Sequence, residues 1–307
     1  MGKIFPNLRT DAIDPNIGAH FERDLDDLRE QVLEHKIPPQ NAMTLIPQEG
    51  NVGTYAKTYT HRMAELVGVA QMIADYADDL PIVDAVGEED TYNVKMFGCA
   101  YQFSRKEMLA TDHGIGLDTM RPRSARVAIE QKFNRLQWYG DPTAGIFGFL
   151  NFPFIPRHLA SIPFDSTQDP QDILAEMNTI ANRPSIDTDT VAEPDTMLMA
   201  PAQYNYVATT PLGEGSDTTI LQHFLGNNPY INSVENVQEL RDAGPDGEDL
   251  VIVYRRSSEI VQHKLVEPFT QMEPQQRNLA VVTNCVGQTG GVVSDYPAEM
   301  LIAELPE

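Results

Sequence analysis

The sequence is poor in cysteine and has no long apolar run. Cys99 and Cys285 are its two cysteines, so it has neither a disulfide framework nor a paired-cysteine metal motif. This usage predicts synthesis in a reducing cytoplasm. A membrane-spanning helix needs about 18 consecutive apolar residues, and the chain offers no such run. The opening MGKIFPNLRT also lacks the apolar centre of a signal peptide, so we expect a soluble cytoplasmic product.

Positive charge is scarce as well. The chain has 22 Lys and Arg residues against 45 Asp and Glu residues, a formal net charge of −23. Such a surface repels DNA phosphates and anionic membranes, because binding to either relies on Lys and Arg. Hydrophobic residues make up 41% of the 307 residues, which is enough for one large or two modest globular domains.

Catalytic motifs are missing. The sequence has no nucleophile elbow, no Walker A loop and no dinucleotide fingerprint. Its seven histidines are dispersed, with no HxxH or HxxxH spacing of the kind that zinc sites use. Residues 187–189 and 242–249 carry enough carboxylates to be considered for a cation, but both fit solvated turns better. We therefore expect no enzyme activity, no metal and no cofactor.

One stretch carries the marks of a long helix, which we expect over residues 118–139. Pro122 falls in its first turn, where a missing N–H costs little, and either Asp118 or Thr119 can cap it. Gly140 suits the left-handed position that ends a helix. Apolar residues recur every three or four positions along one face: Ala125, Ile129, Phe133 and Leu136. That face should pack on the rest of the chain.

The other side of this helix is basic in an otherwise acidic chain. It carries five cationic side chains: Arg121, Arg123, Arg126, Lys132 and Arg135. Because carboxylates dominate elsewhere, we expect these cations to pair with acidic groups of this chain or of a partner rather than with nucleic acid. An acidic run at Glu88, Glu89 and Asp90 is either solvated or faces basic residues of a neighbour.

The elements before this helix have no obvious partner within the chain. A short helix is expected where four apolar residues share one narrow face: Phe21, Leu25, Leu28 and Val32. So short a helix must dock on something to be stable. Strands expected over 54–62 and 92–103 are separated by a long excursion, which predicts a projecting antiparallel loop. A phase change at residues 96–98 suggests a bulge or a strong twist there.

Helices and strands alternate between about residues 170 and 265, which predicts an α+β or α/β layer. Asp169 and Pro170 open a helix that we expect to end before a polar loop over 184–194. Two further helices are expected over 203–209 and 218–225. Strands are expected over 197–200, 231–237, 250–254, 260–266, 279–286 and 292–293.

The order of these elements resembles the major capsid proteins of tailed bacteriophages, which share the Hong Kong 97-type fold with encapsulin shell proteins. The most specific likeness runs from Tyr139 through Asp141 to Gly145–Asn151, where these capsid proteins carry a G-D … G-I/L-x-G-L-L-N pattern. Leu198–Pro201 followed by Tyr204 also resembles their strand–proline–helix passage.

The resemblance implies an α+β, Hong Kong 97-type fold. Its expected parts are an N-terminal arm with a short helix (1–50), an extended two-stranded loop (51–103), a peripheral domain with a spine helix (104–165, helix 118–139), an axial domain (166–257), and the return strands of the peripheral domain with the end of the axial domain (258–307).

The resemblance also implies a function. The chain would be a structural capsid protein that self-assembles through hexamers and pentamers into an icosahedral phage head around double-stranded DNA, without sequence-specific DNA contact and without a membrane partner. It would assemble in the host cytoplasm and end in the virion, with portal, scaffold or decoration proteins as further partners. Assembly contacts are expected at Arg121, Arg123, Arg126, Lys132, Arg135, Glu88, Glu89, Asp90, Phe21, Leu25 and Leu28.

Two alternatives stay open. An encapsulin-like compartment shell enclosing a cargo enzyme would share the same fold. A soluble metal- or nucleotide-dependent enzyme would belong to a different class altogether, and it has no motif in its favour.

Overall fold

The computed structural model describes residues 38, 40–67, 84–112, 120–213, 215 and 217–306. The chain divides into two compact units, Met1–Pro39 and Gln40–Glu307. The short helix expected around Phe21, Leu25 and Leu28 lies outside the described residues, as does the expected helix cap at residues 118–119. The architecture below is that of the second unit.

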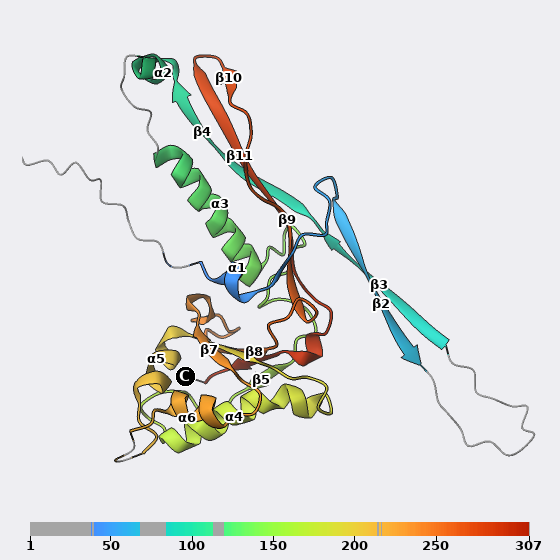
Figure 1. The fold of residues 1–307 in the computed structure, drawn as a ribbon, viewed down its shortest axis with the longest axis vertical. Helices are drawn as coiled ribbons and strands as arrows, with labels where there is room; N and C mark the ends of the chain where they lie inside the picture. Colours follow the sequence, from blue (N-terminus) through green and yellow to red (C-terminus); the bar gives the residue numbers. More distant parts are fainter. Residues whose placement is uncertain are drawn as a thin grey trace, which may run out of the picture. The chain divides into compact units, whose positions relative to one another are not determined.

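A five-stranded sheet supports the long helix α3 (Met120–Tyr139) (Figure 1). Its strands are β1 (Gln48–Glu49), β4 (Lys95–Ser104), β9 (Val261–Gln271), β10 (Gln275–Arg277) and β11 (Ala280–Ser294). The central strand β11 pairs antiparallel with β4 along one edge and with β9 and β10 along the other. Helix α2 (Arg105–Asp112) directly follows β4.

The spine helix expected from the sequence is confirmed, with its apolar face on this sheet. Ile129, Phe133 and Leu136 are 2%, 1% and 3% exposed. The Phe133 ring meets the Phe97 ring of β4 edge-on at 4.8 Å between centroids. The 3.6-residue period of the helix therefore brings every predicted apolar position onto one face.

The end of the helix follows the glycine signature. Gly140 has φ +64°, and a Cβ there would lie 2.5 Å from the Ile146 carbonyl oxygen. Asp141 and Ile146 form an antiparallel bridge, in which the Asp141 N–H donates to Ile146 O over 2.9 Å. The turn can close this tightly because only glycine fits at position 140.

A second five-stranded sheet has the order β5–β12–β8–β6–β7. Its strands are β5 (Arg157–Leu159), β6 (Thr196–Met199), β7 (Ser233–Asn236), β8 (Leu250–Tyr254) and β12 (Leu301–Glu304). Both faces are covered. Leu198, Ile252 and Ile302 lie opposite one another and point into a core shared with the first sheet and α3. The adjacent row of the same strands points into a second core beneath three helices.

These three helices are α4 (Pro170–Asp187), α5 (Pro201–Thr209) and α6 (Ile220–Asn227). The Asp169 carboxylate caps α4 by accepting from Gln171 N over 2.9 Å, and Ile173, Met177 and Ile180 are fully buried. The loop expected from residue 184 was wrong, because α4 continues past Pro184 to Asp187. Pro184 is buried on the same face as Ile180, so its packing offsets the hydrogen bond that its ring removes.

Two strands form a separate ribbon that extends away from both sheets (Figure 1). They are β2 (Thr58–Val67) and β3 (Asp84–Asn93), antiparallel from Thr58 opposite Asn93 to Val67 opposite Asp84. The expected projecting loop is therefore present, but its second strand was placed too late. The expected strand 92–103 is interrupted at Val94, and its larger part, β4, pairs with β11 in the main sheet.

Of the bulge or strong twist expected at residues 96–98, the bulge is absent, because β4 and β11 pair without interruption from Lys95 to Ser104. Gly98 serves close approach instead, since a Cβ there would lie 2.6 Å from the Cys285 carbonyl oxygen. The phase change arises because the two faces of β4 have different surroundings. Phe97 packs against the helix, whereas Met96 is 56% exposed. The irregular pairing occurs between β11 and β9, where the register shifts three times.

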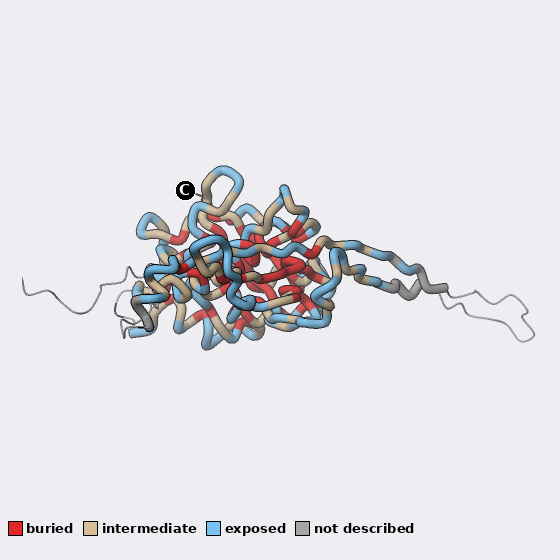
Figure 2. The backbone as a smooth tube through the Cα atoms, turned by 90° about the horizontal axis from the view of Figure 1, so that it is seen from above, coloured by how far each residue is buried: buried red, intermediate tan, exposed pale blue. Residues whose placement is uncertain are grey.

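Several shorter elements complete the unit. The strands expected over 279–286 and 292–293 are one strand, β11, that runs through three glycines. Strands β1, β5, β10 and β12 were not predicted from the sequence. The remaining helical turns are α1 (Ala42–Leu45), η2 (Gln238–Leu240) and η3 (Pro297–Glu299). Figure 2 shows the buried residues concentrated in the body of the unit, whereas the described part of the projecting ribbon is coloured as exposed or intermediate.

Candidate assembly surfaces

The β2–β3 ribbon is a two-stranded sheet that pairs with no further strand among the described residues. A lone two-stranded ribbon is marginally stable at best, and each of its edges presents unpaired backbone N–H and C=O groups. Its cross-strand contacts are weak. Arg62 Nε lies 2.7 Å from Glu89 Oε1, but the two side chains are 79% and 59% exposed, so solvent screens the pair. The ribbon is thus a structural element without a core of its own.

The base of the ribbon is anchored by aromatic residues. The Tyr59 ring of β2 stacks on the Tyr92 ring of β3 with centroids 5.3 Å apart. Tyr92 in turn contacts Phe152 and Phe147, which follow the end of α3, at 6.4 and 6.3 Å. The base is therefore held by the same loop that carries the glycine signature, while the outer part of the ribbon is not.

A partly buried polar cluster lies beside these rings. Lys264 of β9 pairs with Glu49 of β1, and its Nζ lies 5.7 Å from the centroid of the Tyr59 ring. His61 Nε2 lies 3.5 Å from Asp295 Oδ1, an ion-pair distance without a hydrogen bond. Burial raises the pKa of the Asp295 carboxyl, and the nearby His61 and Lys264 oppose that rise. The cluster joins the ribbon to β1 and β9 of the main sheet and to Asp295, which directly follows β11.

These polar residues were missed in the sequence. Glu49 and Lys264 are 215 positions apart, and neither belongs to a motif or a periodic pattern. Their pairing arises from the parallel contact of β1 with β9, and β1 is two residues long. No local signal marks so short a strand, so only the three-dimensional pairing could reveal the cluster.

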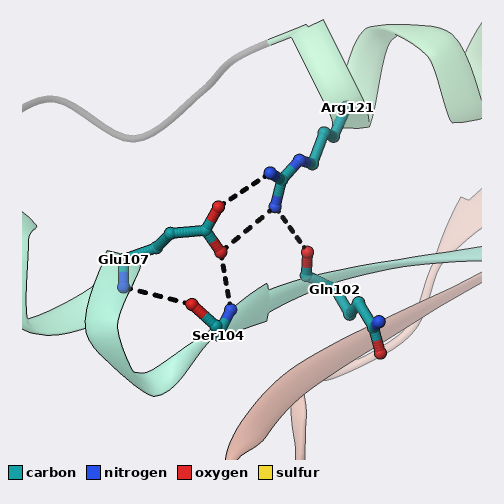
Figure 3. Close-up of polar contacts among 4 residues, drawn as sticks. All are labelled: Gln102, Ser104, Glu107 and Arg121. Atoms are coloured by element: carbon teal, nitrogen blue, oxygen red, sulfur yellow. Dashed lines mark hydrogen bonds and ion pairs between the residues drawn. The ribbon is translucent and has the colours of Figure 1, made fainter.

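Arg121 at the start of α3 is committed to contacts within the chain (Figure 3). Its guanidinium donates to both Glu107 oxygens, at 2.8 and 3.3 Å, and to the Gln102 carbonyl oxygen at 2.7 Å. Hydrogen bonds from Arg121 and from the Ser104 backbone lower the pKa of Glu107 to about 2. Arg121 also lies 5.0 Å from the centroid of the Phe103 ring. It ties α3 to α2 and β4.

Two other basic residues of α3 also have acidic neighbours. Arg126 Nε pairs with Glu130 Oε1 one turn later at 2.7 Å, and Lys132 Nζ lies 3.9 Å from Asp141 Oδ2. Both are exposed, as are Arg123 and Arg135. The expectation of acidic partners is thus met inside the chain for Arg121, Arg126 and Lys132, and the basic side of the helix is partly neutralised by the chain's own carboxylates.

The acidic run lies on the ribbon. In the β2–β3 ladder, Glu88 is opposite Met63, Glu89 opposite Arg62, and Asp90 opposite His61. The structure therefore places this acidic run on β3 of the ribbon, an element separate from the basic helix α3. The remaining predicted contact residues, Phe21, Leu25 and Leu28, lie outside the described residues.

The acidic segment 242–249, which was considered for a cation from the sequence, forms a turn held by hydrogen bonds. In the 242–249 segment, the Asp249 carboxylate accepts from the Asp242 N–H at 2.8 Å and from Gln203 Nε2 at 2.6 Å. Among the described residues, no group of three or more His, Cys, Asp or Glu side chains is arranged to hold a metal ion. In the same part of the chain, no helix combines the length and apolar character required to cross a membrane.

The buried histidine His263 forms hydrogen bonds to neighbouring elements of the fold. His263 of β9 contacts Gln137 Nε2 through Nδ1 at 3.2 Å and Thr289 Oγ1 through Nε2 at 2.8 Å. Burial lowers the pKa of His263 to about 3. The imidazole is therefore neutral at physiological pH and links α3, β9 and β11 through hydrogen bonds.

Comparison with known families gives one match. The model of the family described as "Major capsid protein" matches residues 68–304, well over half of the chain. Among curated proteins, no sequence matches.

Solved structures similar to the chain include several capsids. "The capsid of Myoviridae Phage XM1" has a TM-score of 0.80 at 16% identity and covers 94% of this chain and 99% of its own. "Gordonia phage Cozz" gives 0.60 at 13% identity over 92% and 91%. "Crystal structure of virus-like particle from Pyrococcus furiosus" gives 0.54 at 11% identity over 85% and 91%. The expected α+β, Hong Kong 97-type capsid fold is confirmed by this likeness.

Proposed function

Because the chain belongs to the major capsid protein family, we propose that its copies assemble through hexamers and pentamers into an icosahedral phage head enclosing double-stranded DNA. The structural capsid role follows from the family, and with it a place in the virion. Assembly in the host cytoplasm is part of the proposal, as are portal, scaffold or decoration proteins as further partners.

The observation that carries this proposal is the uncovered ribbon. The second sheet buries both faces and the first packs one face on α3, in cores built by the chain, whereas the described residues of β2 and β3 bury little beyond the rings at their base. An obligate interface between subunits typically buries about 2,000–5,000 Å². Laying the ribbon across the next copy would cover its faces and satisfy its edges, which the chain cannot do alone.

In this proposal the two sheets belong to different domains of the capsid subunit. The sheet around β11, with α3 and the ribbon, would form the peripheral domain, and the sheet around β8, with α4, α5 and α6, would form the axial domain. The apolar stripe at Phe21, Leu25 and Leu28 would belong to an arm that docks on a neighbouring copy.

Charge supports a particular contact between copies. The acidic residues Glu88, Glu89 and Asp90 lie on the ribbon, and Arg135 is an exposed cation on α3. A ribbon that reaches the α3 side of the next subunit would bring these opposite charges together, which favours the correct register over a misplaced one.

The acidic composition suits the proposed contents. With a net charge of −23, the chain has little capacity to neutralise phosphates, so the shell would hold DNA without sequence-specific contact. An encapsulin-like compartment is the second candidate of the same fold. The TM-score of 0.80 to the phage XM1 capsid supports the phage head as the first candidate.

A ribbon deletion tests the proposal. Replacing residues 63–90 by a two-residue turn should leave a soluble, folded subunit that no longer forms shells in sedimentation velocity and electron microscopy. Arg62→Ala is the matched control, since it removes one exposed ion pair of the ribbon and should leave assembly intact. Normal shells from the deletion variant would contradict the role given to the ribbon.

A further inference from the structure

The two cysteines of the chain meet in the main sheet. Cys99 of β4 and Cys285 of β11 are directly opposite in the antiparallel ladder, although they are far apart in sequence. Opposite residues in such a ladder have Cα atoms about 4.5 or 5.5 Å apart. A disulfide bridges Cα atoms about 4.4–6.8 Å apart, so the backbone already has the required spacing.

Both thiols lie on the α3 side of the sheet. Cys285 is completely buried in the cluster that contains Ile129 and Phe133, and Cys99 packs against that cluster. The Cys99 thiol donates to the Ala125 carbonyl oxygen at 3.5 Å. The neighbouring Cys99 side chain contributes, after burial, to the raised pKa of the Cys285 thiol. The backbone spacing and the common face thus place the two thiols where a bond between them can form.

We propose that Cys99 and Cys285 form a redox modification site, at which a low-molecular-weight disulfide converts the two thiols into an intrachain disulfide that clasps β4 to β11. This site is independent of the capsid role. It assigns a reaction to a pair of side chains that assembly does not require.

The two cysteines have different access. Cys99 is partly exposed and borders an open groove of about 490 Å³ between β4 and the start of α3. The groove is lined by Ala100, Met120, Ser124 and Ala128 among others. A small disulfide therefore reaches Cys99, whereas Cys285 is reached only through Cys99.

The reaction takes place in two balanced exchanges. The Cys99 thiolate attacks one sulfur of the small disulfide, forming a mixed disulfide and releasing one small thiolate. The Cys285 thiolate then attacks the Cys99 sulfur, forming the intrachain bond and releasing the second small thiolate. The two protein thiols are oxidised, the small disulfide is reduced to two thiols, and the two protons leave with them.

Burial makes the site slow to react. It raises the pKa of the Cys99 thiol and also that of the Cys285 thiol, so little thiolate is present at neutral pH. The reaction should accordingly accelerate as the pH rises toward the ordinary range of a thiol. A reducing cytoplasm would keep Cys99 and Cys285 as free thiols, and an oxidising medium would convert them into the disulfide.

The clasp should stabilise the folded chain. A disulfide restricts the unfolded chain more when it closes a longer loop, and this loop contains most of the chain. We expect the Tm to rise by on the order of 5–10 °C on closure, given the typical effect of a disulfide in a domain of this size.

The test uses the purified full-length chain incubated with oxidised glutathione at pH 8.5 and then alkylated under denaturing conditions. The expected result is loss of both free thiols, a Cys99–Cys285 peptide link in mass spectrometry, and a higher Tm that dithiothreitol reverses. Cys99→Ser is the matched control, because a hydroxyl can still donate to Ala125 O. It should show neither the link nor the rise in Tm.

Three outcomes would overturn the proposal. They are two free thiols after prolonged oxidation, a stable glutathione adduct at Cys99 without closure, and disulfides that form only between chains on a non-reducing gel. An unchanged Tm in a fully closed sample would contradict the stabilising clasp.

Discussion

Strand β8 and strand β2 lie in the same unit, yet their surroundings are opposite. All five residues of β8 are 0% exposed, flanked by β12 and β6 and covered on both faces. Strand β2 has one partner, β3, and its described residues are partly or fully exposed. One strand is completed by its own chain, and the other is completed only when something else covers it. We interpret that contrast as the division between folding and assembly.

The largest effect on stability is expected from a substitution in the part of the unit that the chain itself buries. Phe133→Asp places an unpaired carboxylate at a site that is 1% exposed, between Phe97 and the β11 backbone. We expect a loss of about 4 kcal/mol or more, enough to unfold the subunit before any assembly. Arg135→Ala, on the exposed side of the same helix, is the control. An unchanged Tm for Phe133→Asp in thermal denaturation would show that this face is not buried.

Acid should weaken the same region through His263. Its pKa is lowered from the ordinary 6.5 to about 3, so the unfolded chain binds a proton that the folded chain rejects. The contribution of neutral His263 is complete above pH 6.5 and is lost as the pH falls toward 3. At pH 4.5 the loss should be about 2–3 kcal/mol.

Urea denaturation of the full chain at several pH values measures this slope. His263→Gln removes the titrating group while keeping hydrogen-bonding capacity toward Gln137 and Thr289. The variant should show a shallower decline between pH 6.5 and 4.5 than the parent. Parallel declines would mean that other groups cause the acid sensitivity.

A smaller effect is expected where the chain bridges two elements at its surface. Arg121→Ala removes the link between α3 and Glu107 of α2. Because both side chains are more than a third exposed, the loss should be modest and should shrink at high salt. The lowered pKa of Glu107 makes this contribution present above pH 4.5 and lost as the pH falls toward 2. A Tm that is equal at low and high salt would argue against an electrostatic link.

The smallest effect belongs to the ribbon. Arg62→Ala breaks the exposed pair with Glu89, and the free energy of unfolding should change by less than about 0.5 kcal/mol. A large loss of stability in denaturant would mean that the ribbon contributes to folding of the isolated subunit, and the contrast with β8 would fail.

The sequence predicted the parts whose structure is decided locally. Helix α3 and helix α4 repeat apolar residues at a helical period, and β8 is a short run of five apolar residues, so all three were found near their true positions. Gly140 and Pro142 likewise mark the end of α3 without reference to distant residues.

The parts that were misplaced depend on distant partners. Strand β3 begins DAVGEED, a composition with little strand preference, and it is extended because it pairs with β2. The cluster of Glu49, Lys264 and Asp295 comes from two strands and the residue after a third, and no motif connects them. Its residues become neighbours only when the sheet forms, so no local sequence pattern predicts the cluster.

Electron microscopy of the purified full-length chain tests the central claim most directly. If the ribbon is an assembly element of a capsid subunit, the chain should form closed, uniform shells at concentrations where the ribbon-deleted variant remains a single subunit. A full-length chain that stays monomeric at every concentration, with its ribbon exposed, would contradict the account.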